Sequence, residues 1–274
     1  MIIKKILKKI LKLKIIYFLI YIRDLPKKIK IYYPKIILKF LITNIYDQNK
    51  KKMFTMRNLG GSTISRGFHI FKTDKEVSEW IENFDDNSLF LDIGANVGLY
   101  SLFAAYKKNK VIAFEPESLN FACLNLNIKD NNFNDLISSY PISINDKNKI
   151  SYLNMSQMKF GGSGNTFDRN TEESGNKFDI IYKQGSFSMT LDHIVDSLDL
   201  SADYIKIDVD GNELKVINGM LKTIKQKSLK SICIELNPKY EEHIQVIEIL
   251  KKDFPKYKKF VYKSEINYNY IFEK

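Results

Sequence analysis

Short apolar runs alternate along most of the chain with segments in which apolar residues recur every three to four positions. The runs predict buried strands, and the recurring segments predict amphipathic helices. Strands are expected at residues 89–93, 111–114, 136–144, 204–208, 231–236, 259–262 and 268–272, and helices at residues 99–106, 119–131, 213–225 and 241–253. A short strand at 69–72 and a helix at 74–84, capped by Thr73 or Asp74, are expected ahead of them. This alternation predicts an α/β fold with a mainly parallel, doubly wound, seven-stranded sheet.

The least regular stretch, residues 149–189, lies between the third and fourth expected strands. Residues 150–155 and 180–183 are expected to pair as a hairpin, and the segment between them is rich in Gly, Asn, Ser and Thr. This composition is typical of a flexible surface loop. The alternative is that the insertion covers a substrate site at the carboxyl edge of the sheet, where Ser163 and Asn165 would hydrogen-bond a polyhydroxylated molecule. The sequence leaves both interpretations open.

The positive charge of the chain is concentrated at its start. The net charge is +11, but residues 1–52 hold 14 Lys, one Arg and two Asp, a net charge of +13, whereas the other 222 residues hold 28 basic and 30 acidic side chains, a net charge of −2. We therefore expect a basic N-terminal appendage over residues 1–52 and one nearly neutral domain over residues 53–274. A neutral domain argues against a broad nucleic-acid surface.

Within the appendage, lysines at positions 4, 5, 8, 9 and 12 alternate with Ile and Leu, which predicts an amphipathic helix that ends near Pro26. Its longest apolar run, residues 15–22, is far shorter than the ~20 residues that a membrane span needs, and no cleavage site of a signal peptide follows it. We expect a helix that lies on an anionic membrane surface, at the inner face of the membrane in a cytoplasmic protein. Because Lys and Ile are abundant throughout the chain, packing of this segment on the domain is the alternative.

The most informative motif is FLDIGANVGLYS, residues 90–101. A strand carrying Asp92 leads into a turn bracketed by Gly94 and Gly98, and a helix follows, which together form a cradle for a nucleotide-like ligand. A dinucleotide fingerprint has the pattern G-x-G-x-x-G, whereas this chain has D-x-G-x-N-x-G with Asn96 in place of a glycine. A carboxylate beside the turn repels a pyrophosphate and suits a cationic ligand. The motif therefore favours S-adenosylmethionine over NAD.

Glu115 lies at the end of the next expected strand, in VIAFEPES, 21 residues beyond Gly94. An acid at this position accepts hydrogen bonds from both hydroxyls of a ribose, in NAD-binding proteins as well. Only the combination of Asp92, Asn96 and Glu115 separates the two cofactors. The alternative is that these acids merely end strands and cap helices.

A third motif, YIKIDVDGNELKVINGM at residues 204–220, places Asp208 and Asp210 at the carboxyl end of another strand. With LDIGANVGLYS, AFEPES and MTLDHIVDSL, it resembles in order the conserved blocks of the FkbM-type family of S-adenosylmethionine-dependent methyltransferases, from about residue 89 to residue 236. The family usually has KIDVEGxE, so Asp210 is a conservative departure. The resemblance implies a Rossmann-like class I methyltransferase fold and O-methylation, frequently of sugar hydroxyls in a glycan or a lipid-linked precursor.

The candidate site residues follow from these motifs. The cofactor set is Asp92, Ile93, Gly94, Ala95, Asn96, Gly98, Glu115, Pro116 and Asp208. A hydroxyl that accepts a methyl group loses its proton, which calls for a base or a metal, and the candidates at the sheet edge are Asp208, Asp210 and Glu235. Asp208 is the preferred base, although it would also suit the cofactor's amino group, and together with Asp210 it is a weak candidate for binding Mg²⁺.

Other residue types indicate little chemistry. Cys123 and Cys233 fall in expected core elements, and His193 and the other two histidines lack the spacing of a zinc site. Two alternative functions stay open: an NAD-dependent oxidoreductase, and a membrane-tethered module that binds a cofactor without catalysis.

Overall fold

The computed structural model describes residues 42–47, 49–60, 62–63, 75–171, 176–261 and 268–274. The chain divides into two compact units, Met1–Ile42 and Thr43–Lys274, and the fold described below is that of the second. The expected amphipathic helix of the appendage, the strand at 69–72 and the cap at Thr73 or Asp74 lie outside the described residues. The division after residue 52 therefore stays a prediction. Among the helices of the described residues, none combines the length and apolar composition that a membrane span needs.

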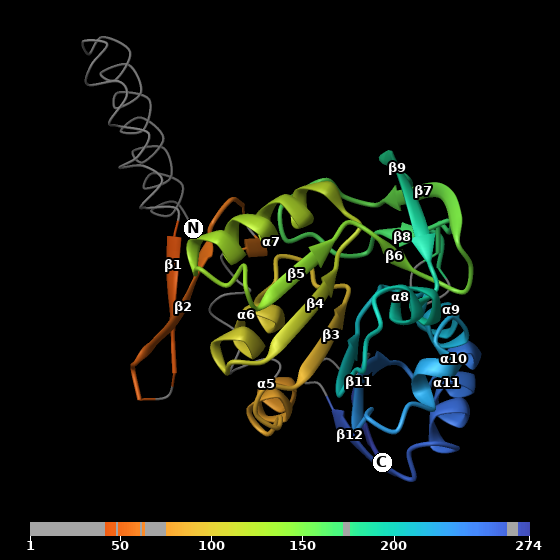
Figure 1. Cartoon of the computed structure of the whole chain (residues 1–274). Coiled ribbons are helices and arrows are strands. Elements are labelled where there is room, and N and C mark those ends of the chain that lie inside the picture. The colour runs from red at the N-terminus through yellow and green to blue at the C-terminus, as the bar shows by residue number, and fades with distance from the viewer. Residues whose placement is uncertain (1–41, 48, 61, 64–74, 172–175, 262–267) are drawn as a thin grey trace. The chain divides into compact units, whose positions relative to one another are not determined.

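Strands and helices alternate along the chain as the sequence predicts (Figure 1). In chain order they are β1 (Ile42–Tyr46), β2 (Lys52–Arg57), α5 (Lys75–Glu82), β3 (Leu89–Ile93), α6 (Leu99–Tyr106), β4 (Lys110–Phe114), α7 (Ser118–Asp130), β5 (Ile137–Tyr140), β6 (Ser143–Ile144), β7 (Lys149–Met155), β8 (Thr166–Phe167), β9 (Tyr182–Met189), α8 (Leu191–Ser197), β10 (Tyr204–Ile207), α9 (Glu213–Asn218), α10 (Leu221–Ile224), β11 (Ser231–Leu236), α11 (Glu241–Lys251), β12 (Lys256–Val261) and β13 (Tyr268–Glu273).

The main sheet has seven strands in the order β12-β13-β11-β10-β3-β4-β5. Strands β5, β4, β3, β10 and β11 are parallel, and β13 runs antiparallel to both β11 and β12. This arrangement confirms the predicted α/β fold with a mainly parallel sheet. The strand order reverses between β3 and β10, and the carboxyl ends of strands at such a switch point form the crevice in which open α/β sheets bind ligands.

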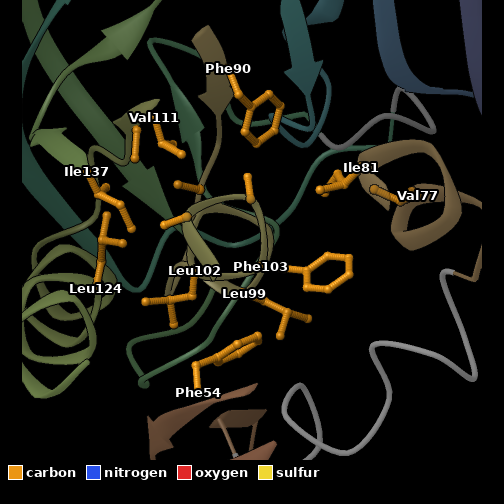
Figure 2. Close-up of a cluster of buried hydrophobic side chains, with 14 of the residues drawn as sticks. Phe54, Val77, Ile81, Phe90, Leu99, Leu102, Phe103, Val111, Leu124 and Ile137 are labelled. Atoms are coloured by element: carbon orange, nitrogen blue, oxygen red, sulfur yellow. The ribbon is translucent and has the colours of Figure 1, made fainter. Parts of the chain in front are cut away.

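Helices cover both faces of this sheet, because alternate residues of each strand point to opposite sides. On one face, α5, α6 and α7 enclose a cluster that includes Phe90 of β3 and Phe54 of β2 (Figure 2). On the other face, α8, α9, α10 and α11 pack on Leu91 and Ile205. Cys123 and Cys233 are both buried in the first cluster, as predicted.

The hairpin of β1 and β2 is joined to α7 by side chains that replace a neighbouring strand. Asn131 accepts a hydrogen bond from the Thr55 backbone N–H (2.7 Å) and donates to the Thr55 carbonyl (2.8 Å), while Asn127 accepts from the Arg57 N–H (2.8 Å). The Arg57 guanidinium pairs with both carboxylate oxygens of Asp130. The hairpin is thus part of the packed domain.

Two predicted elements, one strand and one helix, are each divided into two in the structure. The strand expected at 136–144 is two strands in different sheets, β5 and β6, because Pro141 between them has no N–H to continue a ladder. The helix expected at 213–225 is divided into α9 and α10 around Gly219. A Cβ on Gly219 would lie 2.1 Å from the carbonyl oxygen of Asn145, so the chain passes too close to that backbone for any other residue.

The insertion contributes β7, β8 and β9 to a second sheet of four strands, in the order β6-β9-β7-β8. Strands β7 and β9 pair antiparallel, with Lys149 opposite Ser188 and Met155 opposite Tyr182, which confirms the predicted pairing of the two segments, but the second strand covers residues 182–189 and not 180–183. In Figure 1 this sheet lies beyond the upper ends of β3, β4 and β5. It therefore stands next to the crevice.

Candidate functional site

A cavity of about 880 Å³, including the open solvent at its mouth, lies at the carboxyl edge of β3, β4 and β10. Its walls come from the turn after β3, the end of β4, the start of β6 and the residues that follow β10. Leu153 and Phe167 of the second sheet and Gly162, Ser163 and Asn165 of the loop between β7 and β8 complete the wall. The insertion thus lines the cavity instead of projecting away from it.

The turn after β3 holds its shape because two glycines sit where a side chain has no room. Gly94 has a φ of 81°, and a Cβ there would lie 1.8 Å from the carbonyl oxygen of Asp208. Gly98 has a φ of 89°, and its Cβ would lie 2.4 Å from Leu124 Cδ1. The N–H groups of Gly94 and Ala95 both donate to the Phe114 carbonyl at 3.0 Å, which fastens the turn to β4.

Glu115 follows β4 and is only 5% exposed. One carboxylate oxygen accepts the Asn96 N–H (2.7 Å) and the other accepts the Glu117 N–H (2.8 Å). Burial raises the pKa of Glu115 to about 8, against the lowering effect of the two N–H donors. The side chain lines the cavity, so an acid held at this position meets whatever ligand occupies it.

A cluster of charged groups includes two residues of the cavity wall, Lys206 and Asp208, and the enclosed Asp92. Lys206 of β10 is buried, and its Nζ lies 2.9 Å from Asp208 Oδ2 and 5.0 Å from the centre of the Tyr100 ring. Burial lowers the pKa of Lys206, but the carboxylates of Asp208 and Asp92 outweigh it and the pKa is raised. Asp92 is fully enclosed and accepts a 2.5 Å hydrogen bond from Ser101 Oγ, and burial raises its pKa.

Most residues that the sequence singles out do meet at this cavity. Its wall contains Ile93, Gly94, Ala95, Asn96, Glu115, Pro116, Ser163, Asn165, Asp208 and Asp210. Asp92, Gly98 and Glu235 are not among the lining residues. Asp92 of β3 is buried against Ser101 of α6, and its charge helps to raise the pKa of Lys206. Glu235 lies on β11 opposite Asn269 of β13.

The wall also contains polar residues that the sequence-based set lacks: Tyr100, Glu117, Asn120, Ser143, Lys206 and Asn212. Ser143 Oγ and Asn212 Oδ1 are buried, and neither has a hydrogen-bond partner within the part of the chain that the structure describes. Buried polar atoms are normally paired, so both atoms suit a ligand. For Lys206 a signal existed, because a lysine inside the otherwise apolar strand of residues 204–207 calls for a buried anion.

Across the described residues, no group of three or more His, Cys, Asp or Glu side chains is arranged to hold a metal ion. Asp208 pairs with Lys206, and Asp210 accepts the Gly164 N–H at 2.7 Å. Mg²⁺ binding by these two acids stays a prediction.

Comparison with known proteins gives a family match. The model of the methyltransferase FkbM domain matches residues 92–263. A solved structure of a methyltransferase FkbM from Methylobacillus flagellatus KT is 16% identical with a TM-score of 0.48; the match covers 69% of this chain and 44% of that one. A human methyltransferase 10 domain containing protein is 16% identical with a TM-score of 0.44, and the match covers 78% of this chain and 83% of that one. No curated protein sequence matches the chain.

Proposed function

Since the chain belongs to the FkbM methyltransferase domain family, whose model matches well over half of its length, we propose that it is an S-adenosylmethionine-dependent O-methyltransferase that methylates a hydroxyl of a sugar or glycan. Membership of a methyltransferase family favours methyl transfer over the nicotinamide-dependent alternative.

The observation that carries the proposal is the position of Glu115 in the cavity wall. Its carboxylate is oriented by two backbone N–H groups, and it stands at the end of the strand next to the glycine turn. A carboxylate there suits the two hydroxyls of a ribose. Beside it, Phe114, Ile142 and Ile144 provide an apolar surface for an adenine ring, and the orphaned Ser143 hydroxyl offers that ring a hydrogen bond. The residues present therefore fit the adenosine part of the cofactor.

When bound, S-adenosylmethionine supplies an electrophilic methyl group, so the protein has mainly to align the acceptor and take its proton. Asp208 is the candidate base, because it lines the cavity with a side chain that is 34% exposed. The 2.9 Å contact with Lys206 orients the carboxylate. A carboxylate at this position would accept the proton that the acceptor hydroxyl loses.

Polar groups at the mouth support a polyhydroxylated acceptor. Ser163 is exposed, and Asn165, Asp210 and Asn212 line the same wall. A sugar site is expected to combine apolar surface with hydroxyl and amide groups, and this wall has both. A cell-surface polysaccharide or a lipid-linked precursor is the acceptor we favour, because the basic appendage suits an anionic membrane surface.

The test is transfer of a labelled methyl group from S-adenosylmethionine to a panel of lipid-linked and nucleotide-linked sugars, with and without Mg²⁺. We expect label on at least one sugar hydroxyl. Replacing Asp208 by Asn should then abolish most turnover while cofactor affinity changes little. Labelling of nitrogen or carbon acceptors only would contradict the proposed acceptor class, and an equal loss of binding and turnover would make Asp208 a cofactor anchor.

A further inference from the structure

The loop between β7 and β8 is held over the cavity by hydrogen bonds from three different elements. We call residues 160–165 the glycine wall; Gly162, Ser163 and Asn165 of this segment line the cavity. Gly161 and Gly162 are buried although they belong to a loop. A Cβ on Gly162 would lie 3.0 Å from the Lys159 carbonyl oxygen, and one on Gly161 would lie 3.0 Å from the Thr63 nitrogen. These close contacts show that this part of the loop is packed against the domain.

Asn120 of α7 binds the glycine wall at two backbone groups. Its Oδ1 accepts the Gly161 N–H at 2.8 Å, and its Nδ2 donates to the Gly162 carbonyl at 3.0 Å. Asn120 is only 2% exposed. The oxygen and the nitrogen of the Asn120 amide both bind backbone groups of the glycine wall. This side chain therefore fixes the position of Gly161 and Gly162 relative to α7.

Asn96 holds the same carbonyl from the cofactor side. Its Nδ2 donates to the Gly162 carbonyl at 2.8 Å, and its Oδ1 accepts the Val97 N–H at 2.9 Å. Its own backbone N–H donates to Glu115 at 2.7 Å. Asn96 has a φ of 51°, a conformation that asparagine tolerates better than most residues. One residue therefore contacts both the acid proposed for the ribose and the loop on the acceptor side.

At the far end of the wall, the Gly164 N–H donates to Asp210 Oδ2 at 2.7 Å. Asp210 thus supports the loop. The wall is attached to the turn after β3, to α7 and to the residues after β10, and each attachment is a residue that lines the cavity.

We propose that Asn96 is a positioning residue that joins the two halves of the site: its main chain orients Glu115, and its side chain, together with Asn120, holds the glycine wall so that Ser163 and Asn165 face the acceptor. This inference rests on the proposed function and deepens it. A ligand that binds Glu115 restrains the Asn96 peptide, and the restraint reaches the Gly162 carbonyl through one side chain. Occupation of the cofactor end then orders the acceptor end, and the coupling is reciprocal.

The test is amide hydrogen exchange in the full-length protein, with and without S-adenosylhomocysteine. Asn96→Gly is the sharpest variant, because glycine adopts a φ of 51° without strain and keeps the N–H to Glu115 while the side-chain amide is lost. We expect the wall to exchange about five- to tenfold faster in the unliganded variant, the size of effect that loss of one hydrogen bond produces. The ligand should slow exchange of the wall in the wild type and much less in Asn96→Gly.

Controls make the outcome specific. Asn125 lies on the same helix as Asn120, but its side chain donates to the Phe121 carbonyl and not to the wall. Asn125→Ala should therefore leave the exchange rate of the wall unchanged. Asn120→Asp keeps the acceptor for the Gly161 N–H but not the donor to Gly162, and should have an intermediate effect. Core amides of β3 and β10 report whether each variant is folded. If the wall exchanges in Asn96→Gly and Asn120→Asp as it does in the wild type, the inference is wrong. If S-adenosylhomocysteine does not bind the wild type, the proposed function fails, and exchange in the unliganded variants still decides whether Asn96 positions the wall.

Discussion

At the scale of the residue, Glu115 is subject to opposing effects. Its enclosure favours the neutral acid, while two backbone N–H groups favour the carboxylate, and the pKa is raised to about 8. The acid is therefore mostly protonated at pH 7 in the free protein. Ribose hydroxyls donate to the ionised form, so a ligand that binds there has to displace the proton.

We predict that S-adenosylhomocysteine binding at pH 7 releases up to one proton, because an acid whose pKa is raised to about 8 is mostly protonated at that pH. Affinity should strengthen as the pH rises from 6 to 8 and level off above it, because the ionised form is the binding form. Calorimetry in two buffers with different ionisation enthalpies measures the number of protons released on binding. Glu115→Gln should remove the dependence on buffer, and a buffer-independent heat in the wild type would show that Glu115 is already ionised or is not at the ligand.

The pair of Lys206 and Asp208 gives a second prediction at this scale. Asp208→Asn leaves a buried ammonium without its nearest carboxylate, and should lower the free energy of unfolding by about 1–3 kcal/mol. Because an uncompensated charge causes the loss, the double variant Lys206→Met with Asp208→Asn should regain much of it. Urea denaturation of the two single variants and the double variant measures the coupling. Additive losses would contradict the pairing.

Sequence patterns found the residues of the site that follow a strand end or a glycine turn. Glu115, Asp208 and Asn96 were predicted because their spacing puts them at one edge of a parallel sheet. Asn120 was not predicted, because its contacts with Gly161 and Gly162 join positions about 40 residues apart that nothing in the pattern connects. Asp92 was predicted to face the ligand, but whether an acid before the turn points into the cavity or under the helix depends on the pleat of β3, and Asp92 lies under α6.

At the scale of the element, the break between α9 and α10 shows how one close approach changes a helix. Gly219 lies where a Cβ would meet the Asn145 carbonyl oxygen at 2.1 Å, whereas a Cβ on Gly185 in β9 would meet nothing within 4 Å. The two glycines are therefore a matched pair. Gly219 is needed for packing, whereas Gly185 only adds conformational freedom to the unfolded chain.

We predict that Gly219→Ala lowers the free energy of unfolding by about 1–3 kcal/mol, the usual cost of forcing extra volume into a packed region. Gly185→Ala should leave stability unchanged or raise it slightly, since alanine restricts the unfolded state. Urea denaturation at a fixed pH compares them. Equal stabilities for the two variants would mean that the chain at Gly219 adjusts freely and that the break between the helices has another cause.

Long periodic segments made the main sheet predictable: β3, β11 and α6 begin and end where the sequence indicates. Segments whose limits depend on distant contacts were less predictable. The division of residues 136–144 between two sheets follows from Pro141 and from pairing of β6 with β9, more than 40 residues later. Composition alone did not decide between a loop and a cover for the insertion, and its packing on Asn120 and Asp210 does.

At the scale of the whole molecule, segments far apart in sequence meet at one cavity, because β3, β4 and β10 end at a common edge of the main sheet and residues of the second sheet line the same cavity. The domain of residues 53–274 is nearly neutral, and the positive charge is concentrated in residues 1–52. A basic amphipathic segment is attracted to anionic lipid by about 1 kcal/mol for each basic residue near the surface. We therefore propose a peripheral membrane contact that brings the site to a lipid-linked acceptor.

We predict that the full chain binds anionic vesicles, is partly released at high salt and scarcely binds neutral vesicles, because the attraction is screened. A shortened protein should begin at residue 42, since Ile45, Phe54 and Met56 of the hairpin are buried in the domain. It should keep its affinity for S-adenosylhomocysteine and lose vesicle binding. Sedimentation with vesicles measures the bound fraction of the full chain and of the shortened protein. If the shortened protein unfolds, the appendage packs on the domain; if it still binds vesicles, the contact lies elsewhere.

The central claim is that the cavity beside Glu115 binds S-adenosylmethionine through its adenosine. Calorimetric titration of S-adenosylhomocysteine and of NADH into the wild type and Glu115→Ala tests it most directly. We expect one S-adenosylhomocysteine per chain, no heat from NADH, and a loss of about 1.5–3 kcal/mol of binding free energy in Glu115→Ala, the scale of a hydrogen bond to a charged group. Unchanged affinity in a folded Glu115→Ala, or binding of NADH in place of S-adenosylhomocysteine, would contradict the claim.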